Sequence, residues 1–407
     1  MSRPAWLMPL LAMLAFQAAL TLLGRVAPIL APAFITRNGW TPGEVGALSS
    51  WVSVGSTGFL LLGIPVLRRL GAVRCLQAGI VIGVTGLAAL LGPLPLAMAG
   101  ALMIGLSYGP SNSAGSEVLQ RLAPPRHLNL IFSIKQAGVP LGGIVAGLLL
   151  PGLAQQLGLP ATLALVGLVC LATMWCLEPL RTGSGDAASR DAPQGGWAAL
   201  LGQVLSAANL MRPWRALAQS PRLLRMGLSG AAVAFGQGTW FTFLVVYLNL
   251  QLGWSPVAAG AGFALMQAVS VLARPVLGWL SDRMGSGVPI LRWCAGGSAL
   301  TTVGLALTTP ATPALAVWAL CALAGLTVSA WNGVQLAEVA RCAQGGRVAD
   351  VAGGATLVTF CAFVLSPLTV SAVLALGGTF GHAFALVGLL TLGTLPALWR
   401  IERWPVG

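Results

Sequence analysis

The chain has 407 residues, of which 57% are hydrophobic and only 8% charged, and its mean hydropathy is +0.86. These values exclude an ordinary soluble globular domain and indicate a polytopic membrane protein. A net charge of +13 is compatible with nucleic-acid binding in a soluble protein, so the placement of the charges decides what it means.

Apolar stretches of about 20 residues or more recur along the whole chain, each long enough to cross a hydrocarbon core of ~30 Å as a helix. The first follows Arg3 and is too long for a secretory signal, so we expect it to be retained as a helix. The sequence predicts an all-α membrane protein with twelve transmembrane helices in two six-helix bundles. The spans are 5–34, 43–67, 75–95, 96–120, 129–153, 158–180, 224–250, 255–280, 288–309, 312–337, 351–376 and 379–399.

The longest polar stretch, residues 181–222, separates six spans from six. It begins with Gly, Ser and Asp and then becomes amphipathic, with Trp197, Leu200 and Val204 at helical spacing, which favours a helix on the inner membrane surface. We therefore expect an N-terminal bundle at 1–180, a cytoplasmic linker at 181–222 and a C-terminal bundle at 223–407.

Arginines are distributed unevenly between the predicted loops. With both termini inside, Arg37 is the one arginine in an outer loop, and the other loop arginines fall on the cytoplasmic side. This is the positive-inside rule, and it explains the basic composition without a nucleic-acid partner. We expect a multi-pass protein of a bacterial-type inner (cytoplasmic) membrane with both termini cytoplasmic.

The seven cysteines are scattered and form neither a CxxC motif nor a Cys/His metal spacing. Small buried apolar residues are their simplest interpretation. No disulfide, metal or cofactor is predicted. The sequence also has no phosphate-binding loop, so any energy for transport would come from a gradient.

Two pairs of segments in the two halves resemble each other. PVLRRLGAVR (65–74) follows the second predicted helix and GWLSDRMGSG (278–287) follows the eighth. NSAGSEVLQR (112–121) ends the fourth predicted helix and NGVQLAEVAR (332–341) ends the tenth. Internal repeats of this kind are typical of transporters built around a central cavity.

The second-half loop carries the pattern G-x-L-x-D-R-x-G, with Asp282 and Arg283 at its centre. On these residues the sequence resembles the major facilitator superfamily, and GVPLGGIVAG (138–147) resembles the Gly/Pro-rich segment of that superfamily's fifth helix. The resemblance implies transport by alternating access, with Asp282 stabilising one gating state. The first-half loop has Arg68 where the superfamily has aspartate, so this half must be locked differently.

Two glutamates end the fourth and tenth predicted helices, each with an arginine close by. We expect them to form ion pairs with the basic loops as a gating latch rather than to bind substrate. They are also the glutamates best placed to carry a proton. The predicted gating residues are Asp282, Arg283, Glu117, Arg121, Glu338 and Arg341.

Three cations lie inside predicted spans: Arg25, Lys135 and Arg274. A charged side chain inside a bilayer costs at least ~2.5 kcal/mol on insertion scales, so those that persist usually line a cavity and serve a function. Lys135 is the chain's one lysine, and a desolvated lysine can release a proton, which arginine cannot. The alternative for Lys135 is that it extends to the membrane interface.

Arg274 lies in VLARPVLGWLSD, and ARP-x-x-G resembles the eighth helix of monocarboxylate porters. The resemblance implies that Arg274 binds the substrate carboxylate. Those porters have an aspartate one turn earlier for proton coupling, where this sequence has Ser270. The alternative is that Arg274 pairs with Glu338 or Asp282. Arg25 shares a polar face of its helix with Gln17 and Thr21. The alternative for Arg25 is that its side chain extends to the lipid headgroups at the outer membrane surface.

Uncharged polar residues in the spans are further candidates to line the cavity, although each could instead form a hydrogen bond between helices. They are Tyr108, Asn112, Gln136, Gln237, Trp240, Tyr247, Gln267 and Asn332.

Two or three cations without a deep acid predict an anionic substrate. The sequence therefore predicts a secondary transporter, expected to be monomeric, of small organic anions, most simply carboxylates, by proton symport or anion exchange. Efflux of drugs or other metabolites is the alternative. A remote alternative is an intramembrane serine protease, from GLSG at 227–230, but Ser229 and His382 are predicted at opposite membrane sides.

Overall fold

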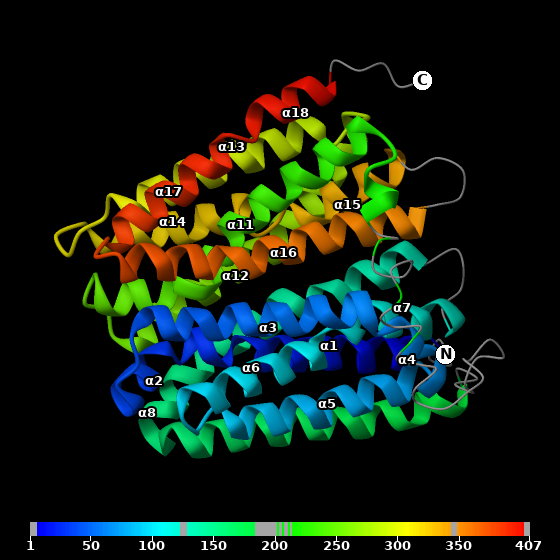
Figure 1. The fold of residues 1–407 in the computed structure, drawn as a ribbon, viewed down its shortest axis with the longest axis horizontal. Helices are drawn as coiled ribbons and strands as arrows, with labels where there is room; N and C mark the ends of the chain where they lie inside the picture. The colour runs from blue at the N-terminus through cyan, green and yellow to red at the C-terminus, as the bar shows by residue number, and fades with distance from the viewer. Residues whose placement is uncertain are drawn as a thin grey trace. The chain divides into compact units, whose positions relative to one another are not determined.

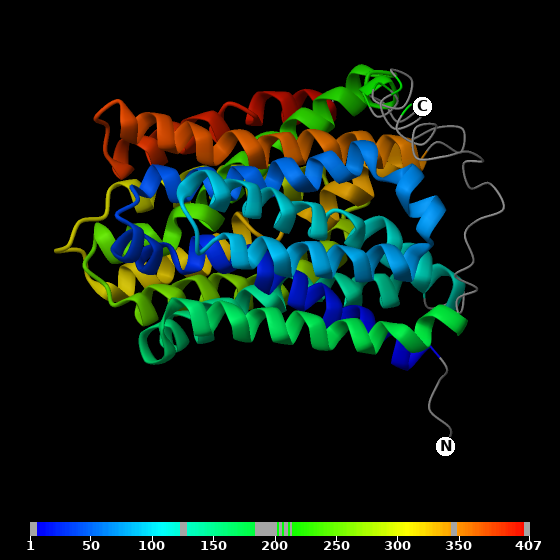
Figure 2. The same cartoon turned by 60° about the horizontal axis from the view of Figure 1, so that its bottom comes forward.

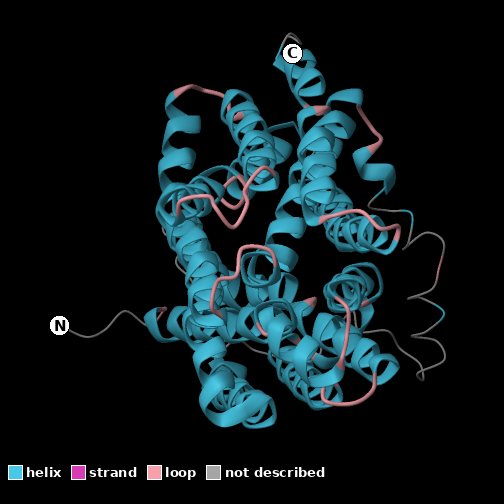
Figure 3. Cartoon of the chain, turned by 90° about the vertical axis from the view of Figure 1, so that its left-hand side faces the viewer, coloured by secondary structure: helices cyan, strands magenta, loops and turns pink. Residues whose placement is uncertain are grey.

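The computed structural model describes residues 6–122, 128–183, 214–342 and 348–402, together with residues 202, 206 and 211. Every regular element within these ranges is an α-helix (Figure 3). The amphipathic helix predicted in the linker 181–222 falls almost entirely outside the described residues, so it stays a prediction.

Contacts between residues divide the chain into two compact units. The first comprises Met1–Ala27 and Trp51–Leu210, and the second comprises Pro28–Ser50 and Met211–Gly407. Pro28–Ser50 therefore groups with the C-terminal half, although the sequence analysis assigned it to the N-terminal bundle. Within the second unit, Ser371 Oγ donates to the Gly43 carbonyl at 2.9 Å, and Ser50 Oγ donates to the Val364 carbonyl at 2.9 Å.

The helices of the first half end at glycines and prolines. Gly71 and Pro93 separate consecutive helices because a positive φ or a missing N–H interrupts the hydrogen-bond ladder. In chain order the helices are α1 (Leu7–Ile29), α2 (Ala31–Asn38), α3 (Pro42–Leu62), α4 (Ile64–Leu70), α5 (Ala72–Ala89), α6 (Leu94–Tyr108), α7 (Pro110–Leu122) and α8 (Leu128–Gly183).

The element α8 contains two of the predicted spans, 129–153 and 158–180. We expected a short loop between them, but helix continues through residues 154–157, and Gly158 alone departs from helical geometry, with φ 79° and ψ 163°. Glycine has no Cβ to oppose this conformation, so one residue suffices for the turn. In Figure 2 the chain turns back at the left-hand end of α8.

In the second half the long helices run side by side, with α11 lying along α16 (Figure 1). Ser220 and Ser255 cap α11 and α12 by accepting hydrogen bonds from the backbone N–H three residues later. The helices are α11 (Pro221–Leu250), α12 (Pro256–Arg283), α13 (Val288–Ala306), α14 (Ala314–Thr327), α15 (Asn332–Cys342), α16 (Val348–Ala375), α17 (Phe380–Leu392) and α18 (Leu395–Glu402).

Ten helical stretches among the described residues are long and apolar enough to cross a membrane. One of them, Ile134–Arg181, contains both helices on either side of Gly158 and so represents two spans. The less apolar α13, with 19 residues, supplies the remaining one. The structure thus accounts for all twelve predicted spans.

Two of these spans are broken at corresponding positions of the two halves. The fourth is divided between α6 and α7 at Gly109, where Pro110 removes one N–H from the ladder while Gly109 itself keeps helical φ and ψ of −51° and −48°. The tenth is divided between α14 and α15 by the non-helical residues 328–331. Interrupted helices at matching positions of a repeat are the usual place where transporters bind their substrates.

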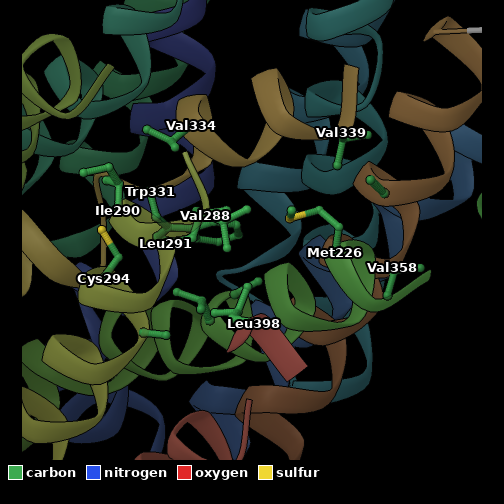
Figure 4. Packing of buried hydrophobic residues seen from close by; sticks show 14 of the residues in the cluster. Met226, Val288, Ile290, Leu291, Cys294, Trp331, Val334, Val339, Val358 and Leu398 are labelled. Carbon is green, nitrogen blue, oxygen red and sulfur yellow. The ribbon is translucent and has the colours of Figure 1, made fainter. Parts of the chain in front are cut away.

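The break in the tenth span is anchored in the hydrophobic core of the second unit. Trp331 is fully buried beside Leu291 (Figure 4), and its indole N–H donates to the Val328 carbonyl at 3.0 Å. This bond satisfies one of the carbonyls that the break removes from the helix ladder. Met226 of α11 and Leu398 of α18 belong to the same core.

Candidate functional site

Lys135 of α8 lies inside the first unit. Its side chain is 2% exposed, and Nζ donates to the Ser111 carbonyl, in the first turn of α7, at 2.8 Å. Gly115, one turn further along α7, makes room for the ammonium group, because a Cβ there would lie 3.1 Å from Nζ. These contacts favour a Lys135 packed inside the unit over one that extends to the membrane interface.

Gln17 and Tyr108 form a second polar contact in the same unit. Gln17 of α1 is fully buried, and its Nε2 donates to the Tyr108 hydroxyl at 3.4 Å. Arg25 is half-buried two turns further along α1. Gln17 was noted in the sequence only as part of the polar face of the first span, and this contact makes it a site candidate.

Arg274 of α12 is held at the break of the tenth span in the second unit. Its Nη2 donates to the Ser329 carbonyl at 3.2 Å, and its Nε donates to Ser270 Oγ at 3.3 Å. Ser329 Oγ in turn donates to Gln267 Oε1 at 3.3 Å. The structure thus brings Arg274 and Gln267 together, as expected from their helical spacing, through a serine that sequence reasoning missed.

The acids considered as partners of Arg274 are engaged elsewhere. Arg341 donates through Nη2 to Asp282 Oδ1 at 2.9 Å and through Nη1 to Glu338 Oε1 at 2.8 Å. Glu338 also accepts the backbone N–H of Gly287 at 2.7 Å. These contacts tie α15 to the end of α12 and the start of α13, the arrangement expected of a latch.

The other predicted gating residues are placed differently. Arg283 lies over the ring of Trp279, 5.4 Å from its centroid. Glu117 is half-buried on α7, and the side chain of Arg121 falls outside the described residues. The gating roles of these residues stay predictions.

The first unit has its own ion-pair group, at Glu178. Glu178 accepts from Gln77 Nε2 at 2.8 Å and from Arg181 Nε at 3.0 Å, and it lies 4.0 Å from Arg74. Sequence reasoning missed Glu178, although the missing aspartate at Arg68 required some other lock for this half. The ending LEPLR of the sixth span was the available signal, because an acid so close to a basic helix end needs a partner.

We expect the two acids of the second-unit latch to contribute very differently to stability. Glu338→Ala should lower the free energy of unfolding by about 2–3 kcal/mol, because a buried carboxylate with two charge-assisted hydrogen bonds is lost. Asp282→Ala should cost at most about 1 kcal/mol, because the Asp282 side chain is 78% exposed. Thermal unfolding of the purified variants measures both, and equal losses would contradict this assignment.

The remaining predicted substrate residues do not all join these clusters. Gln136 is exposed, next to Lys135 but outside its buried surroundings. Gln237 is buried and Asn332 half-buried, and in each the side-chain carbonyl has no hydrogen-bond partner among the described residues. The side chain of Asn112 falls outside the described part of the chain.

Trp240 and Tyr247 of α11 form hydrogen bonds between helices instead of lining a cavity. Trp240 Nε1 donates to Thr302 Oγ1 at 2.9 Å, and the Tyr247 hydroxyl donates to the Leu305 carbonyl at 3.0 Å. Both acceptors belong to α13. For these two aromatic residues the alternative interpretation, contact between helices, is the one observed.

The histidine and serine considered for protease chemistry, His382 and Ser229, have no contact with each other among the described hydrogen bonds. His382 Nδ1 accepts the backbone N–H of Thr379 at 3.2 Å as part of the cap of α17. Ser229 Oγ is buried and has no hydrogen-bond partner within the described ranges. Across those same ranges, no three His, Cys, Asp or Glu residues come close enough to hold a metal ion.

Membrane-length helices, with the buried Lys135 and the half-buried Arg274 beside two interrupted spans, are typical of membrane transport proteins. The Major Facilitator Superfamily model matches residues 6–367, and the chain belongs to this superfamily. It is therefore a multi-pass membrane protein of this superfamily, as the motif around Asp282 indicated.

Curated relatives match parts of the chain. An uncharacterised MFS-type transporter of Mycobacterium tuberculosis is 28% identical over 207 residues, which are 50% of this chain and 42% of that protein. The probable nitrate/nitrite transporter NarK2 of the same organism is 34% identical over 141 residues, 34% of each chain. The chain thus spans less than half the length of either relative.

Solved structures match over nearly the whole chain. A bacterial homologue of the human lysosomal transporter Spinster, inward-facing and occupied, gives a TM-score of 0.74 at 15% identity over 100% of both chains. The nucleoside transporter NupG gives 0.76 at 14% identity over 97% of this chain and 99% of its own. A peptide transporter POT in complex with sulfate gives a TM-score of 0.75 at 16% identity, over 98% of this chain and 96% of that one. At such low identities, these TM-scores establish a shared fold and nothing more.

Proposed function

We propose that the protein is a secondary transporter of small organic anions, with carboxylates as the principal substrates, working by alternating access. Lys135 in the first unit and Arg274 in the second are the proposed anion-binding cations. Inner-membrane localisation with both termini cytoplasmic belongs to the same proposal, supported by the arginine distribution along the loops.

The observation that carries the proposal is the shared placement of the two cations. Each is hydrogen-bonded to a main-chain carbonyl at an interrupted span, Lys135 to Ser111 beside the break of the fourth and Arg274 to Ser329 in the break of the tenth. Helix ends at such breaks orient backbone dipoles toward charged substrates. An anion that reached these groups would replace weak neutral acceptors by a charge-assisted bond.

The distribution of acids supports an anion over a cation. All nine acidic residues lie in the linker or within a few residues of an end of a predicted span. The middle of the bilayer therefore receives cations from this chain but no carboxylate. A cationic substrate would find no opposite charge there, whereas an anion would offset the cost of burying Lys135 and Arg274.

The coupling mechanism follows from what surrounds Arg274. Ser270 occupies the position where the resembling porters place a proton-coupling aspartate, and its hydroxyl binds Arg274 Nε. Serine does not exchange a proton at physiological pH, so coupling through this position is ruled out of the proposal. The proposal retains two modes of coupling, which are proton symport through Lys135 and anion exchange.

Nitrate or nitrite is a second candidate substrate. The similarity to the probable nitrate/nitrite transporter NarK2 favours it, and nitrate, like a carboxylate, is a small planar anion that matches the fork of a guanidinium group. The buried cations suit either anion, so binding measurements must distinguish them.

The function is tested by a thermal-shift screen of the purified full-length protein against monocarboxylates, dicarboxylates, nitrate, nitrite and organic cations. A ligand that binds only the folded protein raises its melting temperature. At a ligand concentration of 100 times the Kd, the free energy of unfolding rises by about 2.7 kcal/mol. We expect carboxylates to raise it and cations not to. Stabilisation by nitrate alone would favour the second candidate, and stabilisation by cations alone would overturn both.

A further inference from the structure

Gln17 carries a buried polar atom that has no hydrogen-bond partner in the described part of the chain. Its Nε2 donates to Tyr108, whereas its side-chain carbonyl oxygen Oε1 has no partner among the described residues. Leaving a buried acceptor unsatisfied costs about 1–3 kcal/mol, and each such atom in a native protein calls for an explanation. An acceptor of this kind fits a hydrogen-bond donor that arrives with a ligand.

Gln17 and Lys135 both lie where α1, α7 and α8 meet. A Cβ built on Gly115 of α7 would lie 3.1 Å from Lys135 Nζ and 3.6 Å from the sulfur of Met13, one turn before Gln17 on α1. One turn after Lys135 on α8, a Cβ built on Gly138 would lie 2.8 Å from Gln17 Cβ. Gln17 therefore packs against α8 at a level about one helical turn, ~5 Å, beyond Lys135.

We propose that Gln17 Oε1 accepts a hydrogen bond from a hydroxyl group of the transported anion while Lys135 binds its carboxylate. A hydroxyl on the carbon next to the carboxylate spans such an offset with one hydrogen bond of about 2.8 Å at each end. The preferred substrates are then 2-hydroxy-carboxylates. This inference rests on the proposed function and narrows its substrate class.

A site that hydrogen-bonds a substrate hydroxyl discriminates against the analogue without it, because the buried acceptor is then left unsatisfied. The test compares glycolate with acetate, and lactate with propionate, by the Kd from thermal-shift titration of the full-length protein. We expect wild type to prefer the hydroxylated member of each pair by at least about tenfold, which corresponds to ~1.4 kcal/mol.

Gln17→Met should reduce this preference to within about twofold while binding of acetate and propionate stays unchanged, because a thioether of similar length replaces the acceptor. Gln77→Met is the matched control. Gln77 is another buried glutamine of the first unit, but its carbonyl accepts from Arg74 and its amide donates to Glu178. This variant should keep the wild-type preference.

The outcomes separate the inference from the function on which it rests. Wild-type protein that binds both members of each pair equally would overturn the hydroxyl subsite and leave the anion transporter standing. A Gln17→Met variant that weakens both members alike would show that the amide contacts the carboxylate, which also overturns it. Binding of no carboxylate at all would overturn the proposed function together with the inference.

Discussion

Lys135→Gln and Arg274→Gln should each reduce uptake of the transported anion into proteoliposomes by about 10- to 100-fold or more. Each variant removes a buried charge-assisted hydrogen bond to the substrate, which contributes about 1.5–3 kcal/mol. The glutamine can still donate to the Ser111 or Ser329 carbonyl that the native cation contacts, so the interrupted spans keep a partner. Folding and membrane insertion should therefore be retained, as judged by gel filtration in detergent.

Arg400→Gln is the matched control for the loss of one positive charge. Arg400 is exposed on α18 and belongs to neither cationic cluster, and its replacement should leave uptake within twofold of wild type. If the Lys135 and Arg274 variants both transported as the control does, these cations would not bind the substrate.

The closest helix packing in the first unit predicts the largest effect on stability. A Cβ added at Gly105 of α6 would lie 2.0 Å from the Val52 carbonyl oxygen of α3, and one added at Gly55 of α3 would lie 2.2 Å from the Leu102 carbonyl oxygen. Both obstacles are backbone atoms, so the helices must separate. Gly55→Ala and Gly105→Ala should each lower the free energy of unfolding by about 3 kcal/mol.

The same substitution at Gly58 is the control, because a Cβ there meets nothing within 4 Å. Alanine is a better helix former than glycine by about 1 kcal/mol, so Gly58→Ala should leave the melting temperature unchanged or raise it. Both measurements use thermal unfolding in the same detergent. Equal shifts at Gly55 and Gly58 would mean that the close contact between α3 and α6 does not limit stability.

The fold was largely predictable because membrane-spanning helices can be recognised in a sequence by their length and apolar composition. The all-α membrane fold and the superfamily were both confirmed, and the motif around Asp282 was sufficient to indicate the superfamily. The helix interruptions were harder to predict. Gly109 and Pro110 are visible in the sequence, but the unwinding at residues 328–331 contains no proline and depends on how Trp331 is buried.

The candidate site was predictable in its charges but not in its contacts. Arg25, Lys135 and Arg274 stood out because a cation in an apolar span is costly. The hydrogen-bond partners of these cations could not be recognised in the sequence. Ser329 looks ordinary in the sequence, and only the break in its helix presents its carbonyl and hydroxyl to Arg274 and Gln267. Gln17 is one of several polar residues in the sequence, and only the structure shows that its side-chain carbonyl is buried without a partner among the residues described.

The sequence by itself determined that the protein lies in a membrane, that the chain crosses it many times and that its spans carry positive charge, because these follow from composition along the chain. Only the tertiary structure decided which polar atoms meet. Hydrogen bonds act over about 3 Å, and contacts such as that between Lys135 and Ser111 join residues that helix packing alone brings together.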